Sequence, residues 1–340
     1  MSTNIGIDLG SSKTILFSGS NIVLEEPSVA IVDTDTWEPL YFGEKAFKMV
    51  GRTSEYYTAV FPIEYGVIAD YGVAEQMVRY FMRKAFGNRI LKPKVIVTVP
   101  SGVTSVQHRW AAKAVEASGA RNVLTIESPI AAAIGLGIDF SKPRGNMIID
   151  IGAGTTDIAV ISMGGIATCD SARVASSDFD NAIIRHIRKE HNMQIGLQSA
   201  QNIKKQIGSV VPRPIEIAIQ AKGSNLFTGM PQIFEVTSSE IYEALKEPAL
   251  NICKAIQAVL EKTEPDLVSD ILQDGIMLTG GGALIYGMEQ LLSEYLGARV
   301  TIAPDPLHSV VKGAITALKN PELLKNGNYR LRSIQDLIIE

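Results

Sequence analysis

Two turns made of small and hydroxyl-bearing residues each follow an apolar strand that ends in an aspartate, Asp8 in one copy and Asp150 in the other. Glycine lets the backbone approach a ligand closely, and free amides and threonine hydroxyls can donate hydrogen bonds to phosphate oxygens. The aspartate suits Mg²⁺, which keeps most of its hydration shell and is held through water. The residues predicted to surround the phosphates are Gly10, Ser11, Ser12, Lys13, Gly152, Ala153, Gly154, Thr155 and Thr156.

The same order of residue types occurs in both turns. When the two aspartates are aligned, Gly10 pairs with Gly152 and Thr14 pairs with Thr156. One such turn is as readily an ordinary Gly/Thr-rich hairpin. Two copies so far apart instead indicate two related halves, each of which offers one hairpin to a shared cleft. Lys13 has no counterpart in the second copy, and its positive charge suits a β- or γ-phosphate.

A third stretch, Gly280-Gly281-Gly282, joins a buried strand to a helix predicted over 283–296. Three successive glycines leave bare backbone against which a flat ring or a ribose can lie. The alternative is a flexible joint between the strand and the helix. The four histidines have neither metal-ligand spacing nor a nucleophile partner, so we expect structural or surface roles for them.

Length and composition restrict the class of protein. A chain of 340 residues exceeds the size at which one core keeps growing, so two domains of roughly 150 residues are expected. A net charge of -4 and a pI near 5.7 argue against nucleic acid as a partner. The two cysteines form no metal-type pair and suit a reducing cytosol. With no signal-like N-terminus and no apolar run near the ~20 residues of a bilayer span, we expect a cytoplasmic protein.

The elements that position these residues alternate between strands and helices, which predicts an α/β fold with mixed sheets covered by helices. In the first half, a loop-rich stretch reads as a small inserted subdomain. In the second half, the strongest helical patterns are expected over 177–190, 199–207 and 241–262, and strands over 214–220 and 276–279.

Five segments occur in the order of the five motifs of the actin/Hsp70/hexokinase ATPase superfamily, at 8–14, 127–135, 150–157, 278–286 and 306–314. Within it, nearly the whole chain resembles the MreB/Mbl family of bacterial actin homologues, as in 51–53, 66–70 and 157–166. The resemblance implies the actin-like ATPase fold, with two duplicated RNase H-like α/β domains, each carrying a smaller inserted subdomain, and a nucleotide in the central cleft. The implied limits are 1–144 for domain I with an insert at about 29–70, 145–315 for domain II with an insert at about 180–240, and 316–340 for a C-terminal segment that returns to domain I.

The resemblance also assigns roles to residues. Glu127 resembles the residue that orients the attacking water, since it ends a strand at the cleft; a helix N-cap is its structural alternative. Asp8 and Asp150 would hold Mg²⁺ through water, and Asp150, Thr155 and Thr156 would join Glu127 in catalysis. Gly281 and Gly282, with Gly280 before them, would back the nucleoside. Its other side would be formed by Gln201, Lys204 and Lys205.

The activity implied is slow hydrolysis of ATP to ADP with Mg²⁺, coupled to assembly of the chain into paired filaments. These filaments would lie on the inner face of the cytoplasmic membrane and organise cell-wall synthesis and rod shape, with the cell-wall elongation machinery as partner and no nucleic acid. Helix 110–117 resembles the part that pairs two filament strands; plain packing in the core is its alternative. Phe86, Ile90 and Leu91 are apolar residues flanked by basic ones, and they match the family's membrane-inserting loop. The alternative is that Ile90 and Leu91 cover the core of the domain.

Three departures from the family pattern bear on turnover. Ala153 interrupts a usual triple glycine, Ala175-Ser176 replaces paired glycines, and Gln201-Asn202 replaces an acidic pair beside the ribose. Two other classes share the superfamily motifs. One is a chaperone-type ATPase module, for which no peptide-binding domain follows Glu340. The other is a small-molecule kinase, for which we identify no acceptor-activating aspartate.

Overall fold

A computed structural model describes residues 4–87, 93–324, 327 and 329–339. A six-stranded mixed sheet forms the centre of the first lobe, in the order β19-β10-β9-β1-β2-β3. Its strands alternate in burial or are buried throughout, as expected for a sheet covered by helices. They are β1 (Asn4–Leu9), β2 (Lys13–Ser18), β3 (Asn21–Pro27), β9 (Lys94–Val99), β10 (Asn122–Glu127) and β19 (Arg332–Ser333).

A five-stranded sheet forms the centre of the second lobe, in the order β13-β12-β11-β17-β18. In both sheets an antiparallel hairpin lies beside a parallel strand, so β1-β2-β9 corresponds to β11-β12-β17. This repeat is the one predicted from the two aspartate-containing turns. The strands are β11 (Asn146–Ile151), β12 (Thr156–Ser162), β13 (Gly165–Ala172), β17 (Ile276–Thr279) and β18 (Val300–Ile302).

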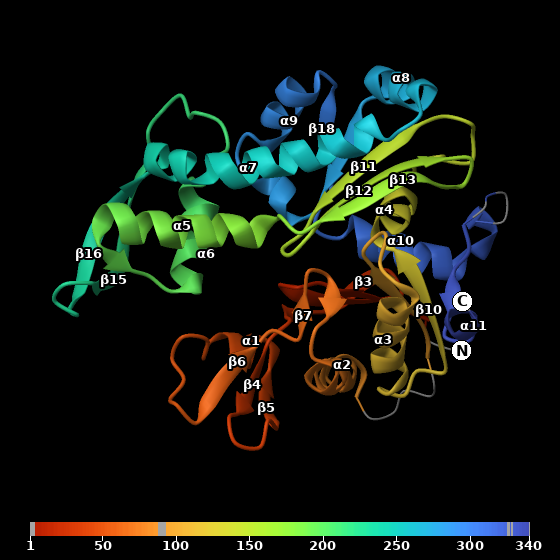
Figure 1. Cartoon of the computed structure of the whole chain (residues 1–340). Coiled ribbons are helices and arrows are strands. Elements are labelled where there is room, and N and C mark those ends of the chain that lie inside the picture. The colour runs from red at the N-terminus through yellow and green to blue at the C-terminus, as the bar shows by residue number, and fades with distance from the viewer. Residues whose placement is uncertain (1–3, 88–92, 325–326, 328, 340) are drawn as a thin grey trace.

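Helices cover both sheets, and two of them pack between the lobes (Figure 1). Helices α4 (Ser128–Gly135) and α10 (Ser309–Lys319) cross so closely that a Cβ on Gly313 would lie 1.6 Å from the carbonyl oxygen of Ala131. Glycine is therefore required at this crossing. Buried residues of both sheets join α4 and α10 in one shared core. The other elements of the first lobe are α2 (Tyr71–Phe86), α3 (Ser105–Glu116), η2 (Pro321–Leu324) and α11 (Asp336–Ile339).

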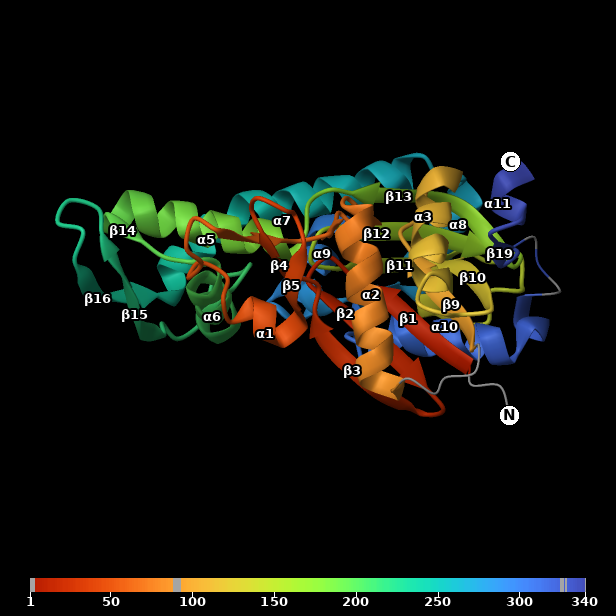
Figure 2. The ribbon, with the colours of Figure 1, turned by 90° about the horizontal axis from the view of Figure 1, so that it is seen from below.

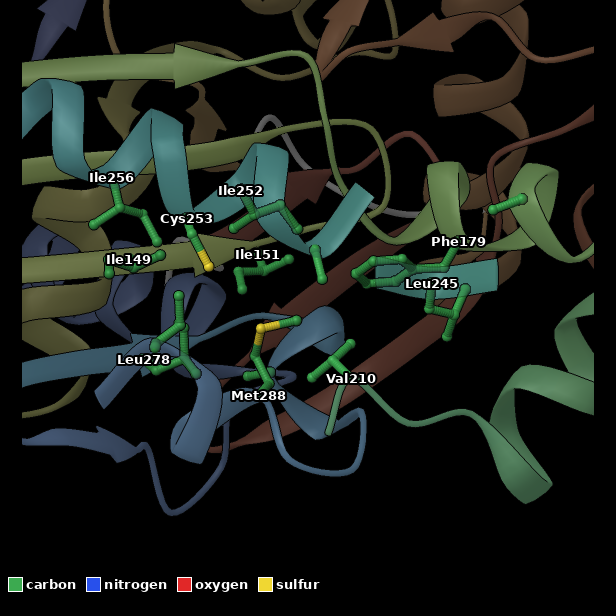
Figure 3. Packing of buried hydrophobic residues seen from close by; sticks show 14 of the residues in the cluster. Ile149, Ile151, Phe179, Val210, Leu245, Ile252, Cys253, Ile256, Leu278 and Met288 are labelled. Carbon is green, nitrogen blue, oxygen red and sulfur yellow. The ribbon is translucent and has the colours of Figure 1, made fainter. Parts of the chain in front are cut away.

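The core of the second lobe lies between its sheet and helix α7 (Ser238–Glu261). Figure 3 shows Ile149 and Leu278 of the sheet facing Cys253 and Ile256 of α7, with Phe179 farther along the same core. Thr237 begins α7 with a capping box to Glu240, so the helix starts at Ser238. The remaining helices of this lobe are α5 (Ser176–His191), α6 (Leu197–Ile207), α8 (Pro265–Asp274), η1 (Gly281–Leu284) and α9 (Met288–Leu296).

Two small subdomains project from the same side of the lobes (Figures 1 and 2). The first contains β4 (Ala30–Asp33), β5 (Pro39–Phe42), α1 (Gly43–Phe47), β6 (Tyr57–Val60), β7 (Ile63–Glu64) and β8 (Val67–Ile68). The second contains β14 (Met193–Gln194), β15 (Ala218–Asn225) and β16 (Pro231–Thr237), together with α6. Among the described residues, no helix carries an apolar stretch that could span a bilayer.

Two expected elements were wrong in detail. The helix expected over 283–296 is divided into η1 and α9, because Gly287 has a φ of 84° and separates them. The strand expected over 214–220 instead spans Ala218–Asn225. Pro212 and Pro214 lack the N–H that a strand interior needs, so pairing with β16 begins only at Ala218.

Candidate functional site

The two aspartate-containing hairpins face each other across a cavity of about 570 Å³ between the lobes, within the size range of small-molecule sites. Most of the residues predicted from the sequence lie together on its wall. They are Asp8, Gly10, Ser11, Ser12, Lys13, Asp150, Gly152, Ala153, Gly154, Thr155, Gln201, Lys204, Lys205, Gly280, Gly281 and Gly282.

Both hairpins turn in the same way. The amide of Gly10 donates to the carbonyl of Lys13 over 3.1 Å, and the amide of Gly152 donates to that of Thr155 over 2.8 Å. A Cβ on Gly10 would lie 2.8 Å from that same carbonyl oxygen, so a side chain cannot be accommodated there. The turns therefore present backbone to the cavity from opposite sides.

The tips of the hairpins nearly touch. A Cβ on Gly154 would lie 2.6 Å from Oγ of Ser11, and that Oγ accepts a hydrogen bond from the amide of Gly66 over 2.9 Å. Gly66 belongs to the turn between β7 and β8, and it also lines the cavity. The first small subdomain is thus tied to both hairpins at this end of the cavity.

Three buried carboxylates at the base of the hairpins lie near enough to influence one another's pKa. Burial raises the pKa of Asp8, and Oγ1 of Thr98 donates to its Oδ1 over 2.7 Å. Burial, together with the nearby charges of Asp157 and Asp8, raises the pKa of Asp150 well above its ordinary value. Burial also raises the pKa of Asp157 to about 6. Such a group of acids favours a bound cation, which would offset their mutual repulsion.

The opposite wall is formed by α5 and α6. Nζ of Lys204 lies 2.9 Å from Oδ1 of Asp180 and also donates to the backbone oxygen and the hydroxyl of Ser176. Burial lowers the pKa of Lys204 and raises that of Asp180. Arg213 lies over the ring of Tyr286, 4.1 Å from its centroid, at the same end of the cavity. This wall therefore offers polar groups and an aromatic ring to a ligand.

The three glycines between β17 and η1 have different surroundings. A Cβ on Gly280 would lie 2.4 Å from Oδ1 of Asp150 and 2.3 Å from the carbonyl oxygen of Ile151. A Cβ on Gly282 would lie 2.3 Å from Cγ2 of Ile151. A Cβ on Gly281 would make only an ordinary van der Waals contact, 3.5 Å from Leu307. Two of the glycines therefore let the strand end pack against the second hairpin.

Glu127 and Thr156 are not among the lining residues. The hydroxyl of Thr156 points away and donates to the carbonyl of Val174 over 2.7 Å. Glu127 is 8% exposed, next to the cavity-lining Ser128, and its side chain makes no capping hydrogen bond to α4. Burial raises the pKa of Glu127, whereas hydrogen bonds from Ser101 and from the amide of Gly102 and the charge of Arg332 lower it. Glu127 therefore occupies the N-cap position of α4, but its carboxylate does not cap the helix.

The sequence did not single out several lining residues. Asp157 belongs to the second hairpin, but the pattern of that hairpin gave it no role. It lies on β12 where this strand pairs with β13. Thr98 and Tyr286 lie on separate elements that only the fold brings together. The additional residues include Gly66, Thr98, Asp157, Ser177, Asp180, Arg213, Tyr286 and Leu307.

Of the predicted membrane loop, only its first residue is described. Phe86 ends α2 and packs, half-buried, against the core of the first lobe. Ile90 and Leu91 lie outside the described residues.

Comparison with known proteins agrees with this architecture. The family model described as MreB/Mbl protein matches residues 2–326. The cell shape-determining protein Mbl of Bacillus cereus is 41% identical over 323 residues, covering 94% of this chain and 97% of the relative. The cell shape-determining protein MreB of Escherichia coli is 41% identical over 325 residues, covering 94% of each chain.

A solved structure is similar over the same extent. The crystal structure of MreB 5 of Spiroplasma citri bound to AMPPNP superimposes with a TM-score of 0.89 at 33% identity, covering 95% of this chain and 97% of that one. This likeness confirms the α/β class and the actin-like fold expected from the sequence. With its duplicated hairpins, its cavity and a family match over nearly its whole length, the chain belongs to the MreB/Mbl family of actin-like cytoskeletal proteins.

Proposed function

We propose that the chain binds ATP with Mg²⁺ in the cavity between its lobes, hydrolyses it slowly and assembles with copies of itself into filaments. The observation that carries the proposal is the meeting of the two hairpins, where Gly154 and Ser11 nearly touch above a group of buried acids. Backbone from both lobes then surrounds one ligand, so a triphosphate would bridge them. Closure of the lobes around it would alter the end surfaces through which copies associate.

The acids fit a magnesium ion held through water. Asp8 and Asp150 line the cavity, and Oδ1 of Asp157 accepts no hydrogen bond from the described residues. No three acidic, histidine or cysteine side chains in the described part of the chain converge as direct ligands. Asp8 and Asp150 would therefore hold the hydrated ion, which would screen the phosphate charge.

For hydrolysis, we assign Glu127 as the residue that orients water. It ends β10 beside Ser128, at the edge of the cavity, and burial raises its pKa, which makes the carboxylate a better proton acceptor. Thr155 lines the cavity and would contact phosphate, and Asp150 would act through the hydrated ion, whereas the hydroxyl of Thr156 is engaged with Val174. The Ala153 and Gln201 departures from the family pattern suit slow turnover.

The family supports our proposals for filament assembly and for the location of the filaments. The relatives are named as cell shape-determining proteins, so we assign this chain to filaments that organise cell-wall synthesis together with the elongation machinery. In helix α3, Ala111, Ala114 and Val115 are buried in the core, as the packing alternative expects. Trp110 of the predicted pairing helix is exposed, together with Val106 one turn earlier, so we assign strand pairing to these two side chains. Phe86, Ile90 and Leu91 would attach the filament to the inner face of the cytoplasmic membrane.

Sedimentation with Mg-ATP, Mg-ADP or no nucleotide tests the proposal. We expect polymer to pellet with Mg-ATP, and phosphate release to slow at least tenfold in Glu127→Ala while nucleotide binding is kept. No pellet, combined with hydrolysis stimulated by peptides, would indicate a chaperone-type module, and a phosphorylated metabolite would indicate a kinase.

Membrane attachment is tested separately by co-sedimentation with anionic liposomes. The double variant Ile90→Ser, Leu91→Ser is expected to lose binding. A matched change on a remote apolar surface, Ile215→Ser and Ile217→Ser, is expected to keep it. Equal binding by both variants would rule out the loop.

A further inference from the structure

The C-terminal segment connects the two lobes next to Glu127. Gly327 lies against the turn between β12 and β13, where a Cβ on Gly164 would lie 2.3 Å from Cα of Gly327. The amide of Tyr329 then donates to the carbonyl of Gly164 over 3.2 Å. Two residues of β19 finally pair with β10 at the edge of the first sheet. The segment is thus anchored on the second lobe at one end and on the first at the other.

The side chain of Tyr329 extends the pairing of β10 with β19 beyond the last backbone pair. The register of β10 with β19 covers only Leu124 and Thr125. Beyond it, the amide of Glu127 donates to the phenol oxygen of Tyr329 over 2.7 Å. The ring packs against the core shared by the two sheets, which fixes where the oxygen lies. A side chain thereby takes the place of a backbone acceptor at the strand end that carries Glu127.

The same segment places a positive charge near the carboxylate. Arg332 of β19 interacts favourably with the ionised form of Glu127, and the nearby charge of Glu127 adds to burial in raising the pKa of Tyr329. One short segment therefore acts on both the backbone and the side chain of this glutamate. The family match ends at residue 326, so the segment lies outside the matched region.

We propose that Gly327 and residues 329–333 form a strap that positions Glu127 for catalysis, with Tyr329 as the positioning residue and Gly164 as its anchor on the second lobe. The inference rests on the proposed role of Glu127 in ATP hydrolysis. A misplaced water-orienting carboxylate lowers the rate of the chemical step without weakening substrate binding. Through the anchor, rotation of the second lobe would move the strap and hence the end of β10.

The test is Tyr329→Phe in the full chain, which keeps the ring and removes the acceptor. We expect kcat for ATP hydrolysis to fall about tenfold or more, with KM and nucleotide Kd within about twofold of wild type. Hydrogen exchange at the end of β10 should accelerate. The matched control is Tyr295→Phe, because that hydroxyl donates to Gln257 on the far side of the second lobe. Its kcat should stay unchanged.

Combination with Glu127→Ala separates the two proposals. If the strap acts through the glutamate, adding Tyr329→Phe to Glu127→Ala lowers the rate no further. A second variant, Gly164→Ala, pushes Gly327 away and should give the same loss of kcat at unchanged KM. If Glu127→Ala slows hydrolysis but Tyr329→Phe does not, or if the double variant loses the product of the two single losses, the strap proposal is wrong while the proposed role of Glu127 stands. An unchanged rate in Glu127→Ala overturns the proposed role of Glu127, and the strap with it.

Discussion

Lys13 forms an ion pair with Glu25 of the neighbouring strand, at the edge of the cavity that its own hairpin lines. The other carboxylate oxygen of Glu25 lies 3.4 Å from Nε2 of His308, whose Nδ1 lies 2.8 Å from Asp305. In the proposed complex a phosphate would share the three donors of Lys13 with Glu25, while His308 keeps Glu25 partnered. Glu25 would thus compete with the nucleotide for this lysine.

Replacing Glu25 by Gln should tighten ATP binding. Both side chains are about one-third exposed, so the pair contributes roughly 0.2–1 kcal/mol, and its removal should lower the Kd about 1.4- to fivefold. Titration with a fluorescent ATP analogue measures the change. Glu44→Gln breaks the exposed pair with Lys48 and is the control, with no expected effect. Weaker binding by Glu25→Gln would show that Glu25 supports the site rather than competing with it.

The glycines after β17 should differ in their tolerance of alanine. Gly280 has a φ of 86°, and a Cβ there would meet Asp150 and Ile151, so Gly280→Ala should lower the free energy of unfolding by about 1–3 kcal/mol and abolish Mg-dependent nucleotide binding. Gly281→Ala should change stability by less than about 1 kcal/mol. Urea unfolding and nucleotide titration measure both effects. Equal losses in the two variants would remove the packing explanation.

The buried acids predict a pH dependence of the nucleotide-free protein. The native state keeps a proton on Asp157 up to a pKa of about 6, whereas the unfolded chain loses it near 3.8. Asp157 therefore lowers stability as the pH rises through this window, by about 2–3 kcal/mol in total. Burial lowers the pKa of His108 to about 4, which acts in the opposite direction, so the raw stability curve of wild type is uninformative.

The comparison with Asp157→Asn tests the effect, because the variant removes this titration together with the charge that helps to raise the pKa of Asp150. The free energy of unfolding of the variant, minus that of wild type, should increase by at least this amount as the pH rises from about 4 through about 6.5. Urea unfolding in the presence of a magnesium chelator measures the difference. A difference that does not vary with pH contradicts the raised pKa of Asp157.

The hairpins were predictable from the sequence because their chemistry is local. Asp8 and Gly10 lie two residues apart, as do Asp150 and Gly152, and glycine, hydroxyl and carboxylate residues at that spacing indicate a phosphate turn wherever the strand lies. The repeat then predicted that the two turns share a cleft. Lining residues such as Thr98 and Tyr286 could not be found in this way, because their neighbours are distant in sequence.

Thr156 shows the limit of reasoning by repeat. Its alignment with Thr14 was correct as a pattern, but both hydroxyls bond within the lobes, Thr14 to Ser28 and Thr156 to Val174. The side chain of a strand residue points to one face or the other, and a spacing does not say which face borders the ligand. The domain limits at 144/145 and 315/316 stay a prediction.

The two small subdomains touch across the mouth of the cleft. Nε2 of Gln198, in α6, donates to the carbonyl of Phe47 at the end of α1 over 2.6 Å. This hydrogen bond joins the lobes at the end of the cleft that lies far from the shared core of α4 and α10. A contact at that end opposes rotation of the lobes away from each other most strongly, because it is farthest from the core that connects them. Since a net contribution of about 0.5–1.5 kcal/mol is typical for such a bond, Gln198→Ala should accelerate nucleotide release about two- to tenfold.

Stopped-flow release of a fluorescent ADP measures this rate. Gln206→Ala, an exposed change on the same helix, is the control and should release nucleotide as wild type does. Because a more open cleft would present misaligned end surfaces, Gln198→Ala should also need a higher protein concentration to pellet with Mg-ATP. Faster release with unchanged assembly would separate cleft closure from polymerisation, and an unchanged release rate would show that closure depends on the nucleotide contacts of the hairpins alone.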